Sequence, residues 1–310
     1  MYRYVLKRLL LMIPVVLCIS FIVFGLLALA PGDPASIILG ANASQEDIDT
    51  LNHKFGFDQP FLIRYFNYIK NLTLKFDFGT SYRSNQPVVN EIKSRTPVSV
   101  KLALAGISCA AFVGIPLGVL SAVKQYSLLD TIPTVMAMIL AAMPPFWLGM
   151  LLIYFLSYKL GWFPAFGIST AKNYILPTMS IALIYAAQQM RYTRSSMLET
   201  IRQDYVRTAR AKGAPERLVI WKHALGNALL PTITVIGTNF GALIGGAIIV
   251  ESLFSIPGLG TLIITGINNR DMPTVVGGTI VLATLYCLIL LVVDLIYALI
   301  DPRIKAKYTR

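Results

Sequence analysis

Six apolar segments constrain the fold of this chain more than any other feature of its sequence. They cover residues 9–30, 99–123, 132–157, 175–190, 228–250 and 275–300. A helix needs about 20 apolar residues to cross a bilayer, and all the segments except the fourth reach that length. Charged residues make up 14% of the chain, against about 25% of an average soluble domain. The sequence therefore predicts an all-α integral membrane protein with six transmembrane helices.

The first apolar segment has two interpretations, a cleaved signal peptide or a retained transmembrane helix. Arg3, Lys7 and Arg8 precede it, and residues 28–30 resemble a cleavage site. A signal peptide has an apolar region of about 7–15 residues, whereas this segment has about 22 and would extend about 33 Å as a helix. We therefore expect residues 1–30 to form a retained N-terminal transmembrane helix.

Residues 31–98 are expected to leave the membrane and form a small ordered extracytoplasmic subdomain. The sequence PGDP at 31–34 ends the first helix, because proline lacks an amide donor and restricts the residue before it. The segment 44–56 has the pattern of an amphipathic helix in which Ser44 caps the first turn. A second short helix is predicted over 64–72.

The distribution of basic residues predicts the side of the membrane on which each loop lies. Of the 27 lysines and arginines, 16 lie in short segments on the side of the two termini and three lie in the short loops opposite. Short cytoplasmic loops are rich in these residues, so we expect both termini and the loop 191–226 to be cytoplasmic. The same rule accounts for the net charge of +12, and we expect no nucleic-acid partner.

We expect no metal site, no bound cofactor and no enzyme active site in this chain. Its three cysteines lie singly in apolar segments and its two histidines are far apart in sequence, so we predict neither a disulfide framework nor a metal centre. The phosphate-binding motif G-x-x-x-x-G-K-[ST] does not occur. We assign Gly258-Leu259-Gly260 to an external turn. The chain is therefore not expected to hydrolyse ATP.

The loop 191–226 has the sequence of a rigid helix–turn–helix. Residues 195–212 contain neither glycine nor proline and predict one helix. Gly213 suits the left-handed end of that helix, and Pro215 suits the first turn of the next. Such a basic loop could be anchored on lipid head groups, or it could dock against a protein. The Gly-Pro turn and the small residues around it favour docking.

The segment 205–213 reads YVRTARAKG. It resembles the coupling loop of the permease subunits of ATP-binding-cassette (ABC) importers, in the branch that carries dipeptides, oligopeptides and nickel. The wider family has E-A-A, three residues, G, nine residues and I-x-L-P. Here Gly213 is the glycine, but only Ala209 matches the E-A-A, and Gly226 stands where the proline is expected. The resemblance to the branch also covers RLLLMIPVV, APGDPA, FGTSY, HALGNALLPTITVIG, VESLFSIPGLG and VVDLIYALIDPRI, in that order.

The resemblance implies a type I importer permease fold, divided into residues 1–30, 31–98 and a core permease domain 99–310. It implies a bacterial inner membrane, a second permease chain, two ATPase subunits that bind ATP and Mg, and an extracytoplasmic substrate-binding protein. Short peptides are the implied substrates, and glutathione or a nickel chelate is the alternative. The implied ATPase-coupling residues are Tyr205, Arg207, Thr208, Ala209, Arg210, Ala211, Lys212, Gly213 and Ala214.

Four polar residues within the apolar segments are candidates for the translocation pathway: Gln188, Gln189, Asn239 and Asp294. Hydrogen bonds between helices are the alternative role for the three amides. Asp294 is a candidate because a carboxylate at depth usually faces the interior of a helix bundle or a cavity. The alternative is an ion pair with Arg303 or a loop arginine near the cytoplasmic end of the span. A stand-alone channel or gradient-driven carrier is the alternative class of protein, but it would need a relay of titratable groups.

Three further features have structural interpretations. We expect Glu251 and Asp271, at the outer ends of the last two spans, either to contact the binding protein or to be solvated. Pro144-Pro145 predicts a kink in the third span. The fifth span has glycines at four-residue spacing, Gly237, Gly241 and Gly245. They predict a smooth face on which another helix can pack closely.

Overall fold

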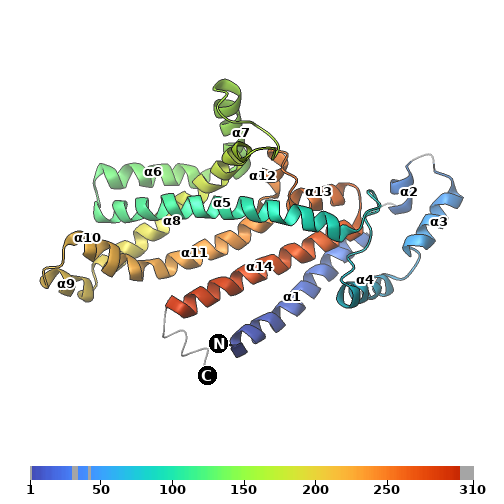
Figure 1. Cartoon of the computed structure of the whole chain (residues 1–310), viewed down its shortest axis with the longest axis horizontal. Helices are drawn as coiled ribbons and strands as arrows, with labels where there is room; N and C mark the ends of the chain where they lie inside the picture. Colours follow the sequence, from blue (N-terminus) through green and yellow to red (C-terminus); the bar gives the residue numbers. More distant parts are fainter. Residues whose placement is uncertain (1, 30–33, 41–42, 301–310) are drawn as a thin grey trace. The chain divides into compact units, whose positions relative to one another are not determined.

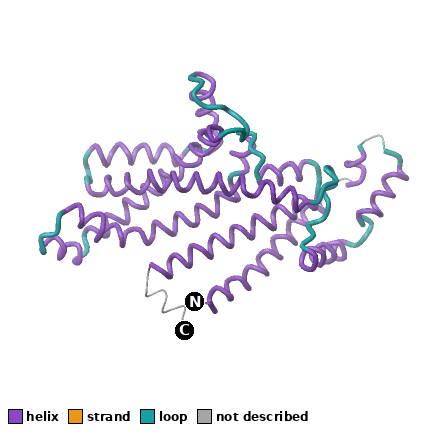
Figure 2. Tube along the Cα trace, viewed as in Figure 1, coloured by secondary structure: helices purple, strands orange, loops and turns teal. Residues whose placement is uncertain are grey.

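The computed structural model describes residues 2–29, 34–40 and 43–300, and this part of the chain is mostly helical (Figures 1 and 2). The α-helices are α1 (Tyr2–Leu29), α2 (Pro34–Leu39), α3 (Gln45–Phe55), α4 (Phe61–Lys75), α5 (Val88–Val123), α6 (Leu128–Ala142), α7 (Pro145–Leu152), α8 (Ile175–Ile201), α9 (Asp204–Ala211), α10 (Glu216–Leu218), α11 (Leu225–Gly246), α12 (Ile248–Leu253), α13 (Leu259–Asn268) and α14 (Met272–Ile300). Ile153–Lys159 and Val219–Ala224 are π-helical, and Ala171–Tyr174 is a 3₁₀ turn. The all-α fold predicted from the sequence is confirmed.

The chain divides into two compact units. The first contains Val100–Ile256 and the end of α14 from Leu288, and the second contains Tyr2–Ser99 and Pro257–Cys287. Helices α5 and α14 each contribute one part to each unit. The predicted division into residues 1–30, 31–98 and 99–310 was made by the expected role of each part, whereas the two units are defined by contacts between residues. The predicted division therefore stays a prediction.

Three helices of the described chain are long and apolar enough to cross a membrane, over Tyr4–Leu29, Val88–Val123 and Met272–Ile296. Two bent pairs of helices raise the number to five if each pair is one span. Helix α8 has 27 residues, which is enough to span, but it is less apolar than the others. The predicted total of six spans is therefore reached only if α8 also crosses the membrane.

The third apolar segment is not a simple kinked helix. Helix α6 ends at Ala142, and α7 begins at Pro145 in a direction that differs by 106°. Pro144 precedes α7 with an extended backbone, φ −63° and ψ 140°. Two consecutive prolines remove two amide donors and disfavour helix in the residue before each. The predicted kink at this position is therefore a complete break.

Several predicted boundaries were too narrow, and the short helices α2 and α13 were missed. Helix α5 begins at Val88, well before residue 99, and α8 continues past residue 190 to Ile201. Helix α13 occupies much of the region assigned to an external turn, with Gly258 as its N-cap residue. The backbone amide of Leu259 donates to Ser99 Oγ at 2.7 Å, which satisfies one of the free amides at the start of α13.

The subdomain between α1 and α5 follows the predicted capping pattern. Ser44 has extended backbone angles and its Oγ accepts from the amide of Asp47 at 3.2 Å. Gly56 ends α3 in the left-handed conformation with φ 69°. Helix α4 is longer than the predicted 64–72. The predicted helix stop at 31–34, apart from Pro34, lies outside the described residues.

The two carboxylates predicted to contact a binding protein or solvent are buried. Asp271 is 4% exposed and accepts from Ser81 Oγ at 2.5 Å, Thr274 Oγ1 at 2.8 Å and the amide of Tyr82 at 3.2 Å. It joins the loop before α5 to the start of α14 within the second unit. Glu251 is 1% exposed. The expectation of a solvated or partner-binding role for this pair was wrong.

Helix α8 packs closely against α5 because α5 has glycines at the contact. A Cβ atom on Gly114 would lie 2.6 Å from the carbonyl oxygen of Ala186, and one on Gly118 would lie 2.7 Å from that of Met190. Such distances are too short for any larger residue. Gly237 of α11 makes a similar close contact with Val293, which confirms the predicted packing role of that glycine.

A buried ion pair joins α5, α6 and α8 within the first unit. Arg194 on α8 donates from Nε to Asp130 Oδ1 at 2.7 Å and from Nη2 to Asp130 Oδ2 at 2.9 Å. Asp130 on α6 is 4% exposed and also accepts from Ser121 Oγ of α5 at 2.5 Å. The amide of Tyr126 donates to it at 3.0 Å. Both ions are therefore paired and hydrogen-bonded, as burial of a charge requires.

We predict that Asp130→Asn lowers the stability of the protein by about 3 kcal/mol, because it leaves Arg194 without a charged partner in a largely buried site. Thermal unfolding in detergent would measure the loss. Glu199→Gln, an equal loss of charge at an exposed position of α8, is the matched control. Equal melting temperatures for the two variants would contradict the assigned role of the ion pair.

Candidate functional site

The basic loop folds as two helices between α8 and α11, at one end of both (Figure 1). The single helix predicted over 195–212 is wrong, because the chain breaks between Ile201 and Asp204. Gln203 there is extended, with φ −72° and ψ 149°. Arg202 and Gln203 carry no helix-breaking signal, so the sequence pattern could not locate this break. The loop turns once at Gln203 and again at Gly213.

Gly213 ends α9 in the left-handed conformation, as predicted, with φ 77°. Its amide donates to the carbonyl of Arg210 at 2.9 Å, and the amide of Ala214 donates to that of Ala209 at 3.3 Å. This pair of bonds is the Schellman motif. A Cβ atom on Gly213 would meet nothing within 4 Å, so glycine is required here for its backbone conformation and not for space.

One buried side chain anchors the loop to the helices beneath it. Val206 of α9 is fully buried. It belongs to a cluster that draws on α5, α8, the π-helical segment and α11: Val119, Ala122, Met197, Val206, Val219, Ile220, Ala224, Leu225 and Ala228. Ala209 and Ala214 pack against the same cluster. Tyr205 Oη also accepts from Asn227 Nδ2 of α11 at 3.0 Å. The loop is therefore a fixed part of the first unit.

An ion pair closes the turn at Gly213. Arg210 donates from Nη2 and Nε to the two carboxylate oxygens of Glu216, at 2.8 and 3.1 Å. These hydrogen bonds hold the pKa of Glu216 below its usual value. A carboxyl group of lowered pKa contributes stability that is complete above its usual pKa and is lost as the pH falls through the lowered one. The ion pair is thus fully formed at neutral pH.

Seven of the nine predicted coupling residues form one exposed surface on the loop, which we call the coupling surface: Tyr205, Arg207, Thr208, Arg210, Ala211, Lys212 and Gly213. Arg207 is available to a partner, since its side chain is 76% exposed and its contact with Asp204 is 3.8 Å long. Arg210 is engaged with Glu216. The surface is basic, with few bulky apolar side chains.

The predicted pathway residues divide into two that lie together and two that lie apart. Gln188 lines a cavity of about 560 Å³ with Ala141, Arg191, Tyr192 and Ser195. Its Oε1 accepts from Asn239 Nδ2 of α11 at 3.3 Å. Sequence reasoning missed Arg191, Tyr192 and Ser195 because they were counted with the cytoplasmic loop. Their spacing from Gln188, three, four and seven residues, is that of one helix face.

Gln189 and Asp294 do not line this cavity. Gln189 is fully buried, faces α5 at Gly114, and neither of its amide atoms has a hydrogen-bond partner in the described chain. Asp294 is half-buried on α14. A role for either in a pathway stays a prediction.

Two family models match the chain. The family described as "Binding-protein-dependent transport system inner membrane component" matches residues 114–306, and its N-terminal counterpart, described as "Binding-prot-dependent transport system membrane comp, N-term", matches residues 1–103. The first match covers α8, the loop and the cavity.

Curated relatives and solved structures agree with these matches. The chain is 40% identical to a dipeptide transport system permease protein of Alkalihalophilus pseudofirmus, over 98% of this chain and 100% of that protein. It is 39% identical to the glutathione transport system permease protein of Escherichia coli K12, over 99% of this chain and 100% of that protein. Its fold is similar to that of the MetNI methionine ABC transporter in inward-facing conformations. The TM-score is 0.59 and the identity 17%, over 68% of this chain and 96% of that chain. The fold is also similar to that of an amino acid ABC transporter crystallised with histidines. The TM-score is 0.52 and the identity 15%, over 69% of this chain and 94% of that chain.

We predict that Glu216→Ala speeds deuterium exchange at the amides of Gly213 and Ala214 by about twofold to fivefold at neutral pH, because an exposed ion pair contributes up to about 1 kcal/mol. Arg217→Ala, at the next position, which is also exposed, should leave the exchange unchanged. Similar exchange in the Glu216 variant and the wild type would show that the ion pair does not hold the turn.

Proposed function

The chain belongs to the family of binding-protein-dependent transport system inner membrane components, and on that premise we propose how it works. It is a multi-pass permease subunit with the type I ABC importer fold. We propose that it is not itself an enzyme. We infer that it forms half of the translocation pathway of an ATP-driven importer. Separate ATPase chains drive it by pressing on the coupling surface.

The observation that carries this proposal is the construction of the loop. It is rigid, because Val206 is buried beneath it and the Arg210–Glu216 ion pair closes its turn. It is also exposed along the coupling surface. A segment that only anchored the chain to lipid head groups would need neither the Schellman turn nor the buried valine. A rigid exposed surface is what a partner needs in order to transmit a displacement.

Helix α8 provides the mechanical connection from the loop to the cavity. It runs without a break from Ile175 to Ile201, and Gln188 lies in its middle. The distance from Gln188 to the end of the helix is about 20 Å at 1.5 Å per residue. Close packing against α5 at Gly114 and Gly118 leaves no space for α8 to bend locally. A displacement of the loop would therefore move the wall of the cavity.

The partners and cofactors follow from this division of labour. We propose a second, similar permease chain, two ATPase subunits and an extracytoplasmic substrate-binding protein. ATP and Mg would be bound by the ATPase subunits and not by this chain. Both termini and the loop would then be cytoplasmic, which agrees with the excess of basic residues on that side.

Short peptides are the proposed substrates. The relatives are named for dipeptide and glutathione transport, and glutathione is itself a small peptide. The side chains of Gln188, Ser195 and Tyr192 can donate or accept hydrogen bonds, as a pathway for peptide groups requires. A nickel chelate is the alternative substrate. A stand-alone channel or gradient-driven carrier is the alternative class, but it leaves the coupling surface without a role.

We predict that Gly213→Val reduces peptide uptake at least tenfold while the protein still inserts in the membrane. A β-branched residue at φ 77° is strained, so the turn would open and displace the coupling surface. Uptake of a labelled dipeptide by whole cells, normalised to the amount of permease in the membrane, measures the effect.

Two control variants separate this cause from general damage. Asparagine tolerates the left-handed conformation, so Gly213→Asn should retain most of the uptake. A Cβ atom on Gly226 would meet nothing within 4 Å, so Gly226→Ala should behave as wild type. Unaltered uptake by Gly213→Val would overturn the docking proposal.

A further inference from the structure

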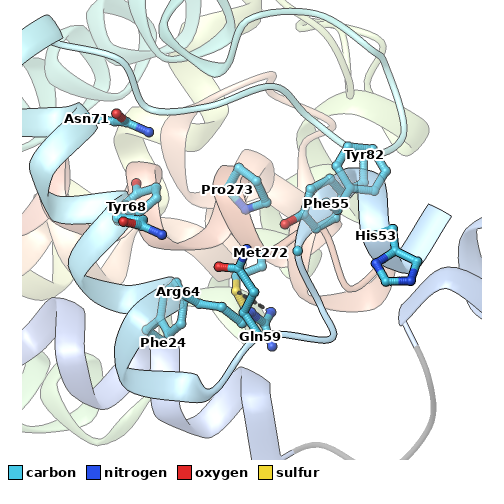
Figure 3. Close-up of a pocket in the computed structure, with 12 residues that line it drawn as sticks. Phe24, His53, Phe55, Gln59, Arg64, Tyr68, Asn71, Tyr82, Met272 and Pro273 are labelled. Carbon is cyan, nitrogen blue, oxygen red and sulfur yellow. Dashed lines mark hydrogen bonds between the residues drawn. The ribbon is translucent and has the colours of Figure 1, made fainter. Parts of the chain in front are cut away.

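A cavity of about 320 Å³ lies within the second unit, and none of the predicted pathway residues lines it. Figure 3 shows its walls. Helix α4 contributes Arg64, Asn67, Tyr68 and Asn71, which share one face because their spacing is three, four and seven residues. The other residues come from α1, the end of α3, the loops beside it and the start of α14: Phe24, His53, Phe55, Gly56, Gln59, Tyr82, Met272 and Pro273.

Arg64 is a half-buried cation that forms no ion pair with a carboxylate in residues 2–29, 34–40 and 43–300. Its guanidinium lies 5.0 Å from the ring centre of Phe57 and 5.9 Å from that of Phe24. Its one hydrogen-bond contact within those residues is Met272 Sδ at 3.7 Å, and sulfur is a weak acceptor. Asp58 is close enough to interact with Arg64 electrostatically, but it pairs with His53 Nδ1 at 2.8 Å.

Burial lowers the pKa of Arg64, because a low-dielectric site disfavours the charged form. An arginine held between two aromatic rings, with a thioether as its acceptor, has several N–H donors still to satisfy. A second polar group in the cavity wall has the same need. The hydroxyl of Tyr68 is buried and has no hydrogen-bond partner in the described chain, and such groups are rare in folded proteins.

The remaining wall defines what else a ligand must present. Amide side chains of Gln59, Asn67 and Asn71 can both donate and accept hydrogen bonds. Phe55 and Tyr82 form an aromatic wall, with ring centres 4.6 Å apart, and Figure 3 shows them together on the far side of Pro273 from Tyr68 and Asn71. The cavity therefore combines one cation, several amides and an apolar wall.

From this arrangement we infer a second ligand site, in which Arg64 binds the carboxylate of a small peptide-like molecule whose apolar side chain lies against Phe55 and Tyr82. Guanidinium and carboxylate match as paired donors and acceptors. The volume is at the lower end of the range for ligand pockets and suits a ligand of about two residues. The site is separate from the cavity at Gln188 and does not depend on the proposed coupling. A carboxylate from a protein side chain has the same chemistry, so the test uses a free peptide.

The test measures binding of Ala-Phe and of its C-terminal amide to the purified full chain in lipid nanodiscs, by calorimetry. We expect saturable binding of Ala-Phe, and at least about tenfold weaker binding of the amide, which lacks the charged acceptor. This comparison uses only the wild-type protein. No binding of Ala-Phe, or equal binding of the acid and the amide, would overturn the inference.

Two variants then locate the binding. Arg64→Gln should weaken binding of Ala-Phe at least about tenfold, whereas Lys70→Gln, an equal loss of positive charge at an exposed position of α4, should leave it unchanged. Tyr68→Phe removes a hydroxyl that has no partner, so it should weaken binding without lowering the melting temperature. Equal affinity in the Arg64 and Lys70 variants would assign the bound peptide to another site and reject this one.

Discussion

The ion pair between Arg194 and Asp130 is the constraint on which the rest of the first unit depends. It fixes α8 to α6 through two hydrogen bonds, and Ser121 brings in α5. Separating these helices would leave two charges in a largely buried site, which is far more costly than losing a surface ion pair. The helices that carry the coupling loop are thereby held as one body near the point where the loop begins.

A displacement applied to the loop must therefore move α8 as a whole. The loop cannot yield independently, because Val206 lies in the same buried cluster as Met197 of α8. Nor can α8 slide easily along α5, because Gly114 and Gly118 bring the two backbones into contact. The cavity residue Gln188 shares this helix. Its hydrogen bond to Asn239 of α11 is long and weak enough to be exchanged when the wall moves.

The sequence predicted those features that depend on neighbouring residues. Apolar segments identified the long helices, and turn chemistry identified Ser44 as a cap and Gly213 as a left-handed end, because both signals are local. The Arg194–Asp130 pair joins side chains 64 positions apart, so no local pattern could find it. The break at Gln203 and the burial of Asp271 likewise arise from packing that no short segment encodes. The cavity at Arg64 was missed for the same reason, since its walls come from four separated parts of the chain.

The central claim is that the coupling surface is seated on a separate ATPase chain. A photoreactive residue at position 208, in the exposed face of α9, would test it most directly after illumination of native membranes and identification of the cross-linked chain by mass spectrometry. The account predicts a cross-link to a protein that contains a G-x-x-x-x-G-K-[ST] motif. It also predicts no such product from position 158, because Tyr158 is 77% exposed at the end of the π-helical segment Ile153–Lys159, which is expected on the opposite side of the membrane. Cross-links from position 208 to lipid alone would contradict the claim and favour a membrane anchor.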